Sequence, residues 1–390
     1  MSRNVCIVGW AHTPFGKLGE LDSEALVADV AGAALEHAGI GTGDVDAIMV
    51  GTYNNGFSRQ GFEAALVALS QPALAYVPAT RVENACATGS AAIYTAADFI
   101  QSGRGRIALV VGVEKMTSLP TAQVGDVLLT ACYQKEEGNG AGGFAGIFGT
   151  IAQTYFDRHG DQSEALARIA AKNHRNGVQN PYAQFRKDLG FEMCNVVSDR
   201  NPLVAGPLRR TDCSLISDGA AAVVLADEET AMRLQRAVRF RARSHVNDIL
   251  PLGRRDPIAF EGARRAWEQS KASAGVSLDD LQFVETHDCF TIAELIEYEA
   301  MGLAPRGQGH RVIEEGITQM GGRLPVNPSG GLKAKGHPIG ATGVSMHVMA
   351  AMQLMGEAGG MQVEGATVGG VFNMGGAAVA NYVSILERAK

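Results

Sequence analysis

The sequence lacks the features that mark membrane-spanning, exported or nucleic-acid-binding proteins. None of its 390 residues lie in an apolar run of the roughly 18 residues that cross a bilayer, and no signal peptide pattern follows Met1. Aromatic residues make up only 6% of the chain and no basic stripe accompanies them. The 34 basic and 41 acidic residues give a net charge of -7, which does not attract nucleic acid. A cytoplasmic protein without membrane or nucleic-acid partners is predicted.

Cysteine is sparse, and its spacing excludes further classes. The six cysteines are far apart, so neither a disulfide framework nor a clustered zinc motif is expected. Cys6, Cys132, Cys194 and Cys213 are interpreted as small buried hydrophobic residues. The chain has no phosphate-binding loop ending in Gly-Lys-Ser/Thr and no Gly-x-Ser-x-Gly elbow. Residues 138–143 fit Gly-x-Gly-x-x-Gly, but no buried strand precedes them, which argues against NAD binding.

What the sequence does contain is typical of a large α/β protein. Hydrophobic residues make up 46% of the chain, and 48 glycines favour close backbone packing. Apolar β-branched runs, such as residues 107–112, alternate with helical patterns at residues 25–38 and 164–173. This alternation predicts an α/β fold with parallel sheets.

An internal repeat divides the chain into two related halves. Cys86-Ala-Thr-Gly-Ser90 opens an apolar helix predicted over residues 87–101, and Gly340-Ala-Thr-Gly-Val344 opens another over 341–355. Both helices are apolar nearly all round, so both must be buried. Residues 111–116 also resemble 370–374, and 218–225 resemble 375–383. We therefore predict two duplicated α/β halves in five layers, α-β-α-β-α, with the two buried helices between two sheets.

The predicted domain boundaries follow from this repeat. Residues 1–118 and 207–233 are assigned to the N-terminal half, and residues 234–390 to the C-terminal half. The intervening segment, residues 119–206, is richer in Gly, Asn and charge and is interpreted as an inserted loop or cap region. Long excursions from a compact fold often form lids or binding loops, so this region is expected to contact substrate and partners.

Three segments contain candidate catalytic residues. Cys86 lies where a turn meets a buried helix, a position whose amides and dipole favour a thiolate nucleophile. His337 is held between Gly336 and Pro338 before the second buried helix, and the repeat places its turn opposite that of Cys86, which suits a Cys–His pair.

The third segment surrounds His287 and Cys289. Alternate residues of a strand share a face, so these two could add a hydrogen-bond donor and a second thiol that moves a proton. The alternative interpretation is a buried cysteine beside Asp288, which would cap the helix that follows.

Together these motifs resemble those of thiolases, over essentially the whole chain. They are Asn-Ala-Cys-Ala-x-Gly-Ser around Cys86, His-Asp-Cys-Phe at residues 287–290, and Gly-His-Pro-x-Gly-Ala-Thr-Gly around His337. The second motif is similar to that of the sterol-carrier-protein type of thiolase. The resemblance implies a thiolase fold and a CoA-dependent acyltransferase of lipid or fatty acid metabolism. It would cleave 3-oxoacyl-CoA with CoA or, in reverse, condense two acyl-CoAs.

The resemblance also implies a role for each residue. Cys86 attacks the thioester, His337 accepts its proton, and Cys289 moves a proton on or off the α-carbon of the acetyl unit. His287 and His337 polarise an enolate oxygen, while the backbone amides of Cys86 and Gly375 form a second oxyanion hole. Commoner thiolases place a second cysteine where this chain has Asn373, and the sterol-carrier type supplies that thiol from the His-Asp-Cys-Phe segment instead.

Further expectations follow from the same resemblance. Acyl-CoA and CoA are the expected ligands, with no tightly bound cofactor and no metal, and the chain is expected to be a homo-oligomer, a dimer or a dimer of dimers. No sterol-carrier domain is expected after Glu387. No residue is assigned to CoA, and the acyl group is not specified.

Four alternatives stay open at this point. A decarboxylating ketoacyl synthase would also use one cysteine and two histidines, but it leaves Cys289 unexplained. Retro-aldol cleavage needs no nucleophilic Cys86. The chain could also be an acyl-CoA-binding subunit that acts with a partner protein. Finally, Cys86, His287, Cys289 and His337 could bind a structural zinc ion, although they lack the usual short ligand pairs.

Overall fold

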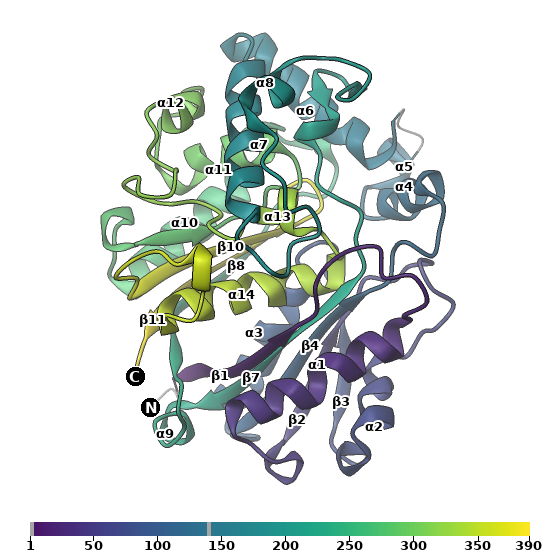
Figure 1. The fold of residues 1–390 in the computed structure, drawn as a ribbon, viewed down its shortest axis with the longest axis vertical. Helices are drawn as coiled ribbons and strands as arrows, with labels where there is room; N and C mark the ends of the chain where they lie inside the picture. The colour runs from purple at the N-terminus through teal and green to yellow at the C-terminus, as the bar shows by residue number, and fades with distance from the viewer. Residues whose placement is uncertain (1–3, 139–141) are drawn as a thin grey trace.

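The fold consists of five layers of helices and strands (Figure 1). The computed structural model describes residues 4–138 and 142–390. Helix α1 (Ser23–Ala38) covers the outer face of one half of the sheet, and α10 (Glu261–Ala274), next to α11 (Thr291–Met301), covers the other half. Helices α3 (Thr88–Gln101) and α14 (Ile339–Met355) lie between the halves. The predicted α-β-α-β-α layering is confirmed, but the two predicted sheets are the two halves of one continuous sheet.

All the main strands described in the structure hydrogen-bond into one sheet, in the order β3-β2-β4-β7-β1-β8-β11-β10-β9. Their bounds are β1 Val5–His12, β2 Ala47–Gly51, β3 Ala79–Val82, β4 Ile107–Glu114, β7 Gly219–Asp227, β8 Val238–Asn247, β9 Phe283–Glu285, β10 Val368–Gly375 and β11 Ala380–Arg388. Among the strands that the structure describes, only β3-β2-β4 and β10-β9 pair in parallel. The prediction of parallel sheets was therefore wrong in part. A tight connection such as that between β10 and β11 forces antiparallel neighbours.

The strand order itself shows the duplication. In the first half the order is β3-β2-β4-β7-β1. In the second half, Val326 bridges β9 in parallel, and β10, β11 and β8 follow. The two halves meet where β1 pairs with β8, through Cys6 opposite Arg239 and Ile7 opposite Val238. The predicted repeat of two α/β halves is thus confirmed, whereas the residue boundaries assigned to each half remain a prediction.

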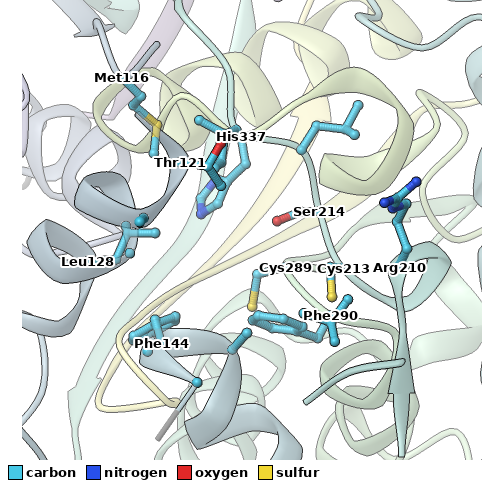
Figure 2. A pocket seen from close by; sticks show the side chains of 18 of the residues that line it. Met116, Thr121, Leu128, Phe144, Arg210, Cys213, Ser214, Cys289, Phe290 and His337 are labelled. Carbon is cyan, nitrogen blue, oxygen red and sulfur yellow. The ribbon is translucent and has the colours of Figure 1, made fainter. Parts of the chain in front are cut away.

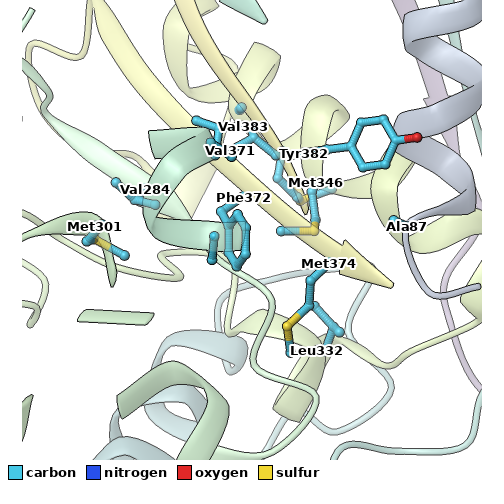
Figure 3. Close-up of a cluster of buried hydrophobic side chains, with 14 of the residues drawn as sticks. Ala87, Val284, Met301, Leu332, Met346, Val371, Phe372, Met374, Tyr382 and Val383 are labelled. Carbon is cyan, nitrogen blue, oxygen red and sulfur yellow. The ribbon is translucent and has the colours of Figure 1, made fainter. Parts of the chain in front are cut away.

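The apolar character of the strands follows from burial on both faces. In β7, Ala221, Val223 and Leu225 contact the central helices, whereas the alternate residues, such as Val224, face α1. A strand covered on both sides is expected to be apolar throughout. Helix α14 is buried nearly all round, and its Met346 packs near Phe372 and Met374 of β10 (Figure 3).

Helices α3 and α14 approach backbone to backbone at equivalent glycines of the repeat. A Cβ atom on Gly89 would lie 2.5 Å from the amide nitrogen of Val344, and one on Gly343 would collide with the amide of Ser90. Only glycine permits this approach. It brings the N-terminal ends of the two helices together, and these are the ends next to Cys86 and His337.

The inserted region is mostly helical. It contains α4 (Thr121–Leu129), α5 (Gln134–Glu137), α6 (Gly143–His159), α7 (Ser163–Gly177), α8 (Gly190–Asn195) and β5 (Leu203–Ala205), which pairs with β6 (Leu208–Arg209) just after the region ends. The Gly-x-Gly-x-x-Gly match follows helix α5, and its residues 139–141 lie outside the described residues. Within the described ranges, no helix is both long and apolar enough to cross a bilayer.

Short helices complete the two halves. They are α2 (Val67–Ser70), α9 (Glu228–Ala231), α12 (Gly309–Glu314) and α13 (Gly331–Lys335). Helix α13 ends two residues before His337, and its cap Gly336 has a φ of 114°, which favours glycine. This geometry turns the chain sharply from α13 into the loop that carries His337.

Candidate active site

A cavity of about 510 Å³ opens at the N-terminal ends of α3 and α14 (Figure 2). Cys86, Cys289 and His337 line it together with residues of the inserted region, among them Leu128 and Phe144. The two halves thus provide the reactive groups, and helices α4 and α6 supply much of the apolar wall. Residues of the inserted region, 119–206, thus line the cavity, and their contact with substrate stays a prediction.

The structure brings the predicted catalytic residues together from distant parts of the chain. The sulfur of Cys86 and a ring nitrogen each of His287 and His337 all lie within 4.8 Å of one another. The two imidazole rings are 5.1 Å apart between centroids and nearly perpendicular, at 82°. Cys289 lines the same cavity. At Gly375, an added Cβ would lie 2.5 Å from the carbonyl oxygen of Asn84, so this backbone lies against the Cys86 turn.

Cys86 is presented by a tight turn directly before α3. Ala85 has a φ of 49°, in the left-handed region, and the amide of Thr88 donates to its carbonyl at 3.1 Å. Burial raises the pKa of the Cys86 thiol to about 12, although the backbone N–H of Gly376 partly opposes the shift. At this sulfur the loss of solvation opposes the favourable effect of the helix dipole, so a base must remove the thiol proton before the sulfur can attack.

His337 is held as a neutral base. Its Nδ1 lies 2.7 Å from the Thr342 hydroxyl, which itself donates to the carbonyl of Pro338 at 3.0 Å. Because a hydroxyl has only one hydrogen, Thr342 must accept the Nδ1–H of His337, which leaves Nε2 free to accept a proton. Burial, and then the charge of Lys335, lower the pKa of His337 to about 3. The ring is therefore uncharged near neutral pH.

His287 is fully buried and has one ring nitrogen free. Its Nδ1 lies 2.9 Å from the side-chain nitrogen of Asn373, and its Nε2 has no hydrogen-bond partner among the described residues. Burial, and then the neighbouring His337, lower the pKa of His287 well below its usual value. An uncharged imidazole with one free polar atom at the site is suited to bind a substrate oxygen.

Cys289 is a buried thiol in the same cavity. Burial is the main reason that its pKa lies well above the usual value, and nearby Cys86, Glu297 and Asp288 raise it further. The carbonyl of Cys289 accepts a hydrogen bond of 2.9 Å from the amide of Ser214, and the ring of Phe290 stacks on Phe148. The thiol is thus protonated, and contacts of its own carbonyl and of the adjacent Phe290 hold the segment in place.

Asp288, between His287 and Cys289, has a structural role of its own. Its carboxylate accepts hydrogen bonds from the amides of Leu332, at 2.6 Å, and Lys333, at 3.2 Å. These are amides of α13, so Asp288 caps α13 and not the helix that follows it in sequence, as the alternative interpretation had it. The bonds tie the His287–Cys289 segment to the loop that carries His337.

Helix α7 braces the same segment from the inserted region. Its Asn173 donates to Asp288 at 2.7 Å, and its Lys172 forms an ion pair of 2.7 Å with Glu294 of α11. Lys172 and Glu294 are both buried. A buried charge without its partner would be very costly, so this pair fixes α7 on α11. The inserted region is therefore more than a substrate cap.

Two residues that anchor the site were not assigned such a role from the sequence. Glu114, at the end of β4, accepts hydrogen bonds from the amides of Tyr53, at 2.8 Å, and Gly340, at 2.9 Å. Asn373, at the equivalent point of β10, contacts the Cys86 turn. Each side chain thus crosses to the buried helix of the other half. The repeat that aligns residues 111–116 with 370–374 was the signal that could have revealed the pair.

The structure brings together only part of the residue set that the zinc alternative requires. The described residues contain one cluster that could hold a metal ion, formed by Cys86, His287 and His337. The thiol of Cys289 does not belong to this cluster, so the complete set of two cysteines and two histidines is not assembled. The sequence-based preference for acid–base chemistry over a structural metal is retained as a prediction.

Comparison with known proteins places these features in context. A family model described as "Thiolase, N-terminal domain" matches residues 5–229, and one described as "Thiolase C-terminal domain-like" matches residues 245–388. An acetyl-CoA acetyltransferase of Methanothermobacter thermautotrophicus is 36% identical over 99% of this chain and 100% of its own length. Sterol carrier protein 2 of Bos taurus is 34% identical over 96% of this chain and 70% of its own length.

A solved structure has a similar fold. It is described as an Ltp2-ChsH2(DUF35) aldolase and superimposes with a TM-score of 0.83, over 99% of this chain and 98% of its own. The sequences are 21% identical, which shows a common fold and nothing about the reaction.

Proposed function

The chain belongs to the thiolase family and is a CoA-dependent acyltransferase, and on that premise we propose that Cys86, His287, Cys289 and His337 carry out its chemistry. The reaction is cleavage of a 3-oxoacyl-CoA by CoA, or the reverse condensation of two acyl-CoAs. The observation that supports these roles best is the convergence of Cys86, His287 and His337 within 4.8 Å. Cys86 and His337, one from each half, line the cavity, and the fully buried His287 lies beside them.

The first step is acylation of Cys86. As the thiol attacks the 3-oxo carbon, its proton passes to Nε2 of His337, which has a free lone pair because Nδ1–H is bound by Thr342. The sulfur–carbon bond forms, and negative charge develops on the carbonyl oxygen. Backbone amides of Cys86 and Gly375 are proposed to stabilise that charge.

The second step breaks the carbon–carbon bond. Collapse of the tetrahedral intermediate leaves the acyl group on Cys86 and releases acetyl-CoA as its enolate. Cys289 donates its proton to the α-carbon, and Nε2 hydrogens of His287 and of the now protonated His337 bind the enolate oxygen. His337 therefore becomes a hydrogen-bond donor only after it has taken the proton of Cys86.

The third step regenerates the enzyme. A CoA thiol enters the cavity and loses its proton to the Cys289 thiolate, which restores the Cys289 thiol. The CoA sulfur attacks the acyl group, the bond to Cys86 breaks, and His337 returns its proton to the Cys86 sulfur. Every group is then in its starting state, so CoA acts as a substrate and no tightly bound cofactor is needed.

Intact-mass spectrometry tests the proposed nucleophile. Wild-type protein mixed with acetoacetyl-CoA should gain the mass of one acetyl group. Cys86→Ala should gain none, because the sulfur that accepts the acyl group is gone. Cys213→Ala provides the matched control, since this thiol lines the same cavity but is not assigned a step. An acyl group still present on the Cys86→Ala protein would refute the assignment.

The other reactions considered from the sequence are not favoured. The fold shared with an aldolase carries no information on the reaction at 21% identity, and a decarboxylating synthase leaves the second thiol without a role. A non-catalytic acyl-CoA-binding subunit does not explain two protonated thiols and a neutral base in one cavity. The family assignment and the site agree on the acyltransferase.

We further propose that the chain is a homo-oligomer that assembles through the exposed edge at β3. Unpaired edge strands invite pairing with another chain. Beside this edge lie three exposed hydrophobic side chains: Tyr76, fully exposed, Phe62 at 78% and Leu69 at 60%. Exposed apolar groups gathered next to an open edge favour a protein interface. We also propose that the protein is located in the cytoplasm.

Light scattering after size-exclusion chromatography tests this interface. Tyr76→Glu should shift the mass towards the 41.0 kDa of a single chain, because a buried charge would oppose association. Met232→Glu changes another exposed apolar residue elsewhere and should leave the mass unchanged. An unchanged mass in the Tyr76 variant would reject the β3 edge as the interface.

A further inference from the structure

Asn373 links the Cys86 segment to the His287 segment at a point where no solvent reaches it. Its side-chain oxygen accepts a hydrogen bond of 2.7 Å from the Ser90 hydroxyl. Its side-chain nitrogen lies 3.1 Å from the carbonyl oxygen of Cys86 and 2.9 Å from Nδ1 of His287. One amide therefore contacts α3, the backbone of the nucleophile and the imidazole of the third segment.

The direction of these hydrogen bonds follows from their partners. A carbonyl oxygen can only accept, so the Asn373 atom facing Cys86 must be the NH₂ group. Its second hydrogen then points to Nδ1 of His287, which must offer a lone pair. A neutral imidazole with an unprotonated Nδ1 carries its hydrogen on Nε2. That Nε2 is the atom without a partner among the described residues.

We propose that Asn373 is a positioning residue that sets the tautomer of His287, so that its Nε2–H is presented to the substrate oxygen. The inference rests on the proposed thiolase chemistry and adds a role for a residue that does not itself touch the substrate. Asparagine suits the task because a side-chain amide donates from one atom and accepts at the other. The carbonyl of Cys86 fixes which of the two atoms faces His287, and the Ser90 hydroxyl donates to the other.

The consequence is that the two histidines are held in opposite tautomers. Thr342 binds the Nδ1–H of His337 and leaves its Nε2 as an acceptor, whereas Asn373 binds the bare Nδ1 of His287 and leaves its Nε2 as a donor. Two identical side chains 5.1 Å apart thereby take different roles, one as base and one as oxyanion donor. The division exists before any substrate binds.

Nitrogen-15 NMR of histidine-labelled free enzyme tests the proposal, because the two neutral tautomers and the imidazolium have distinct spectra. In the wild type, His287 should show hydrogen on Nε2 only, with its signals assigned by their loss in His287→Asn. In Asn373→Asp, of nearly equal size, a carboxylate faces Nδ1, so Nδ1 should become protonated in either the neutral or the cationic ring. Asn381→Asp, at another buried asparagine, is the matched control and should leave His287 unchanged.

Exchange of the α-protons of acetyl-CoA with D₂O supplies a kinetic readout. In Asn373→Asp the carboxylate raises the pKa of His287, whose other neighbouring titratable groups are His337, Cys86 and, at its backbone amide, Glu297. As the pH rises through that pKa, the ring keeps its hydrogen on Nδ1 and loses that on Nε2. Exchange should then fall by about 100-fold, the cost of one oxyanion donor. The wild type should show no such fall.

Two results would overturn the inference. One is a His287 that keeps an unprotonated Nδ1 in folded Asn373→Asp, and the other is a changed tautomer with an unchanged exchange rate at every pH. Asn373→Ala serves if the aspartate variant does not fold, because loss of the donor should make both tautomers detectable. Acylation of Cys86 is measured on the same proteins, so failure of the proposed function would be seen separately.

Discussion

Burial governs the residues of the site more than their charges do. It raises the pKa of both thiols and lowers the pKa of both imidazoles, so all four side chains are uncharged near neutral pH. The charged forms arise only as protons move between them during the reaction. Hydrogen bonds from Thr342 and Asn373, and not ionic pairs, decide which atom donates and which accepts.

Acylation of Cys86 should therefore depend little on pH in the mildly acidic range. The base must be unprotonated, and the pKa of His337 is lowered to about 3, so its lone pair persists until the pH falls towards that value. Single-turnover acylation by acetyl-CoA should change by no more than about twofold between pH 7.5 and pH 5, since an ordinary imidazole near 6.5 would lose most of its activity there. Loss of acylation around pH 6.5 would contradict the neutral, buried base.

At the scale of elements, the site depends on how closely α3 and α14 approach. The contact between Gly89 and Gly343 leaves no room for a Cβ atom. The helices carry the Cys86 turn and the His337 turn at their N-terminal ends, so their separation sets the distance over which the proton moves. Glu114 and Asn373 then fix each helix end from the opposite half.

Gly89→Ala should push the two helix ends apart. A Cβ there would lie 2.5 Å from the Val344 amide, so the backbone must shift, and about 1–3 kcal/mol of stability should be lost, as in other overpacked cores. A displacement near 1 Å at the reacting groups should also cost about 100-fold in turnover. Urea unfolding and steady-state thiolysis measure the two effects.

Gly43→Ala is the matched control, because this glycine has open space around it and no positive φ. It should change neither quantity appreciably. If Gly89→Ala behaved like the control, the close contact of the helices would not be what positions the site.

Much of the arrangement of the helices around the site could be predicted from the sequence. The buried helices predicted over residues 87–101 and 341–355 appear as Thr88–Gln101 and Ile339–Met355, because an apolar run that starts at a small-residue turn defines them locally. The repeat then indicated that their N-terminal ends meet. The antiparallel course of β7 and β11 was missed, since apolar runs do not specify the direction of their neighbours.

The long-range contacts that hold the site together could not be predicted in the same way. Lys172 and Glu294 are 122 positions apart, and the pattern of helix α7 shows only that one of its faces is buried. The same holds for Asn373, whose partners lie 287 and 86 positions away in the chain. Such pairs depend on how the two halves and the inserted region dock, which a local pattern does not contain.

At the scale of the whole molecule, buried histidines couple stability to pH. His174 of α7 is 2% exposed, neither of its ring nitrogens has a partner among the described residues, and burial lowers its pKa to about 2. The unfolded chain binds a proton at this residue below about pH 6.5, whereas the folded chain does not. The folded state therefore loses stability at this site as the pH falls below 6.5.

His174→Leu should remove that loss. Relative to the wild type, the variant should gain about 2 kcal/mol more at pH 5 than at pH 8, since each unit below the unfolded pKa contributes about 1.4 kcal/mol. Guanidinium unfolding at both pH values measures the difference. Thiolysis should be unaffected, because His174 does not line the cavity. An equal change in stability at both pH values would show that the folded state also binds the proton.

The division of labour between the two thiols is the claim on which the proposed mechanism depends, and Cys289→Ala tests it most directly. With acetyl-CoA in D₂O, intact mass should still show acylated Cys86, because CoA can leave as a thiolate without the proton that Cys289 otherwise supplies. Exchange of the acetyl α-protons should fall by about 10²–10⁴-fold, the contribution of a positioned acid–base group. Exchange that persists in this variant, or acylation that disappears together with it, would contradict separate roles for Cys86 and Cys289.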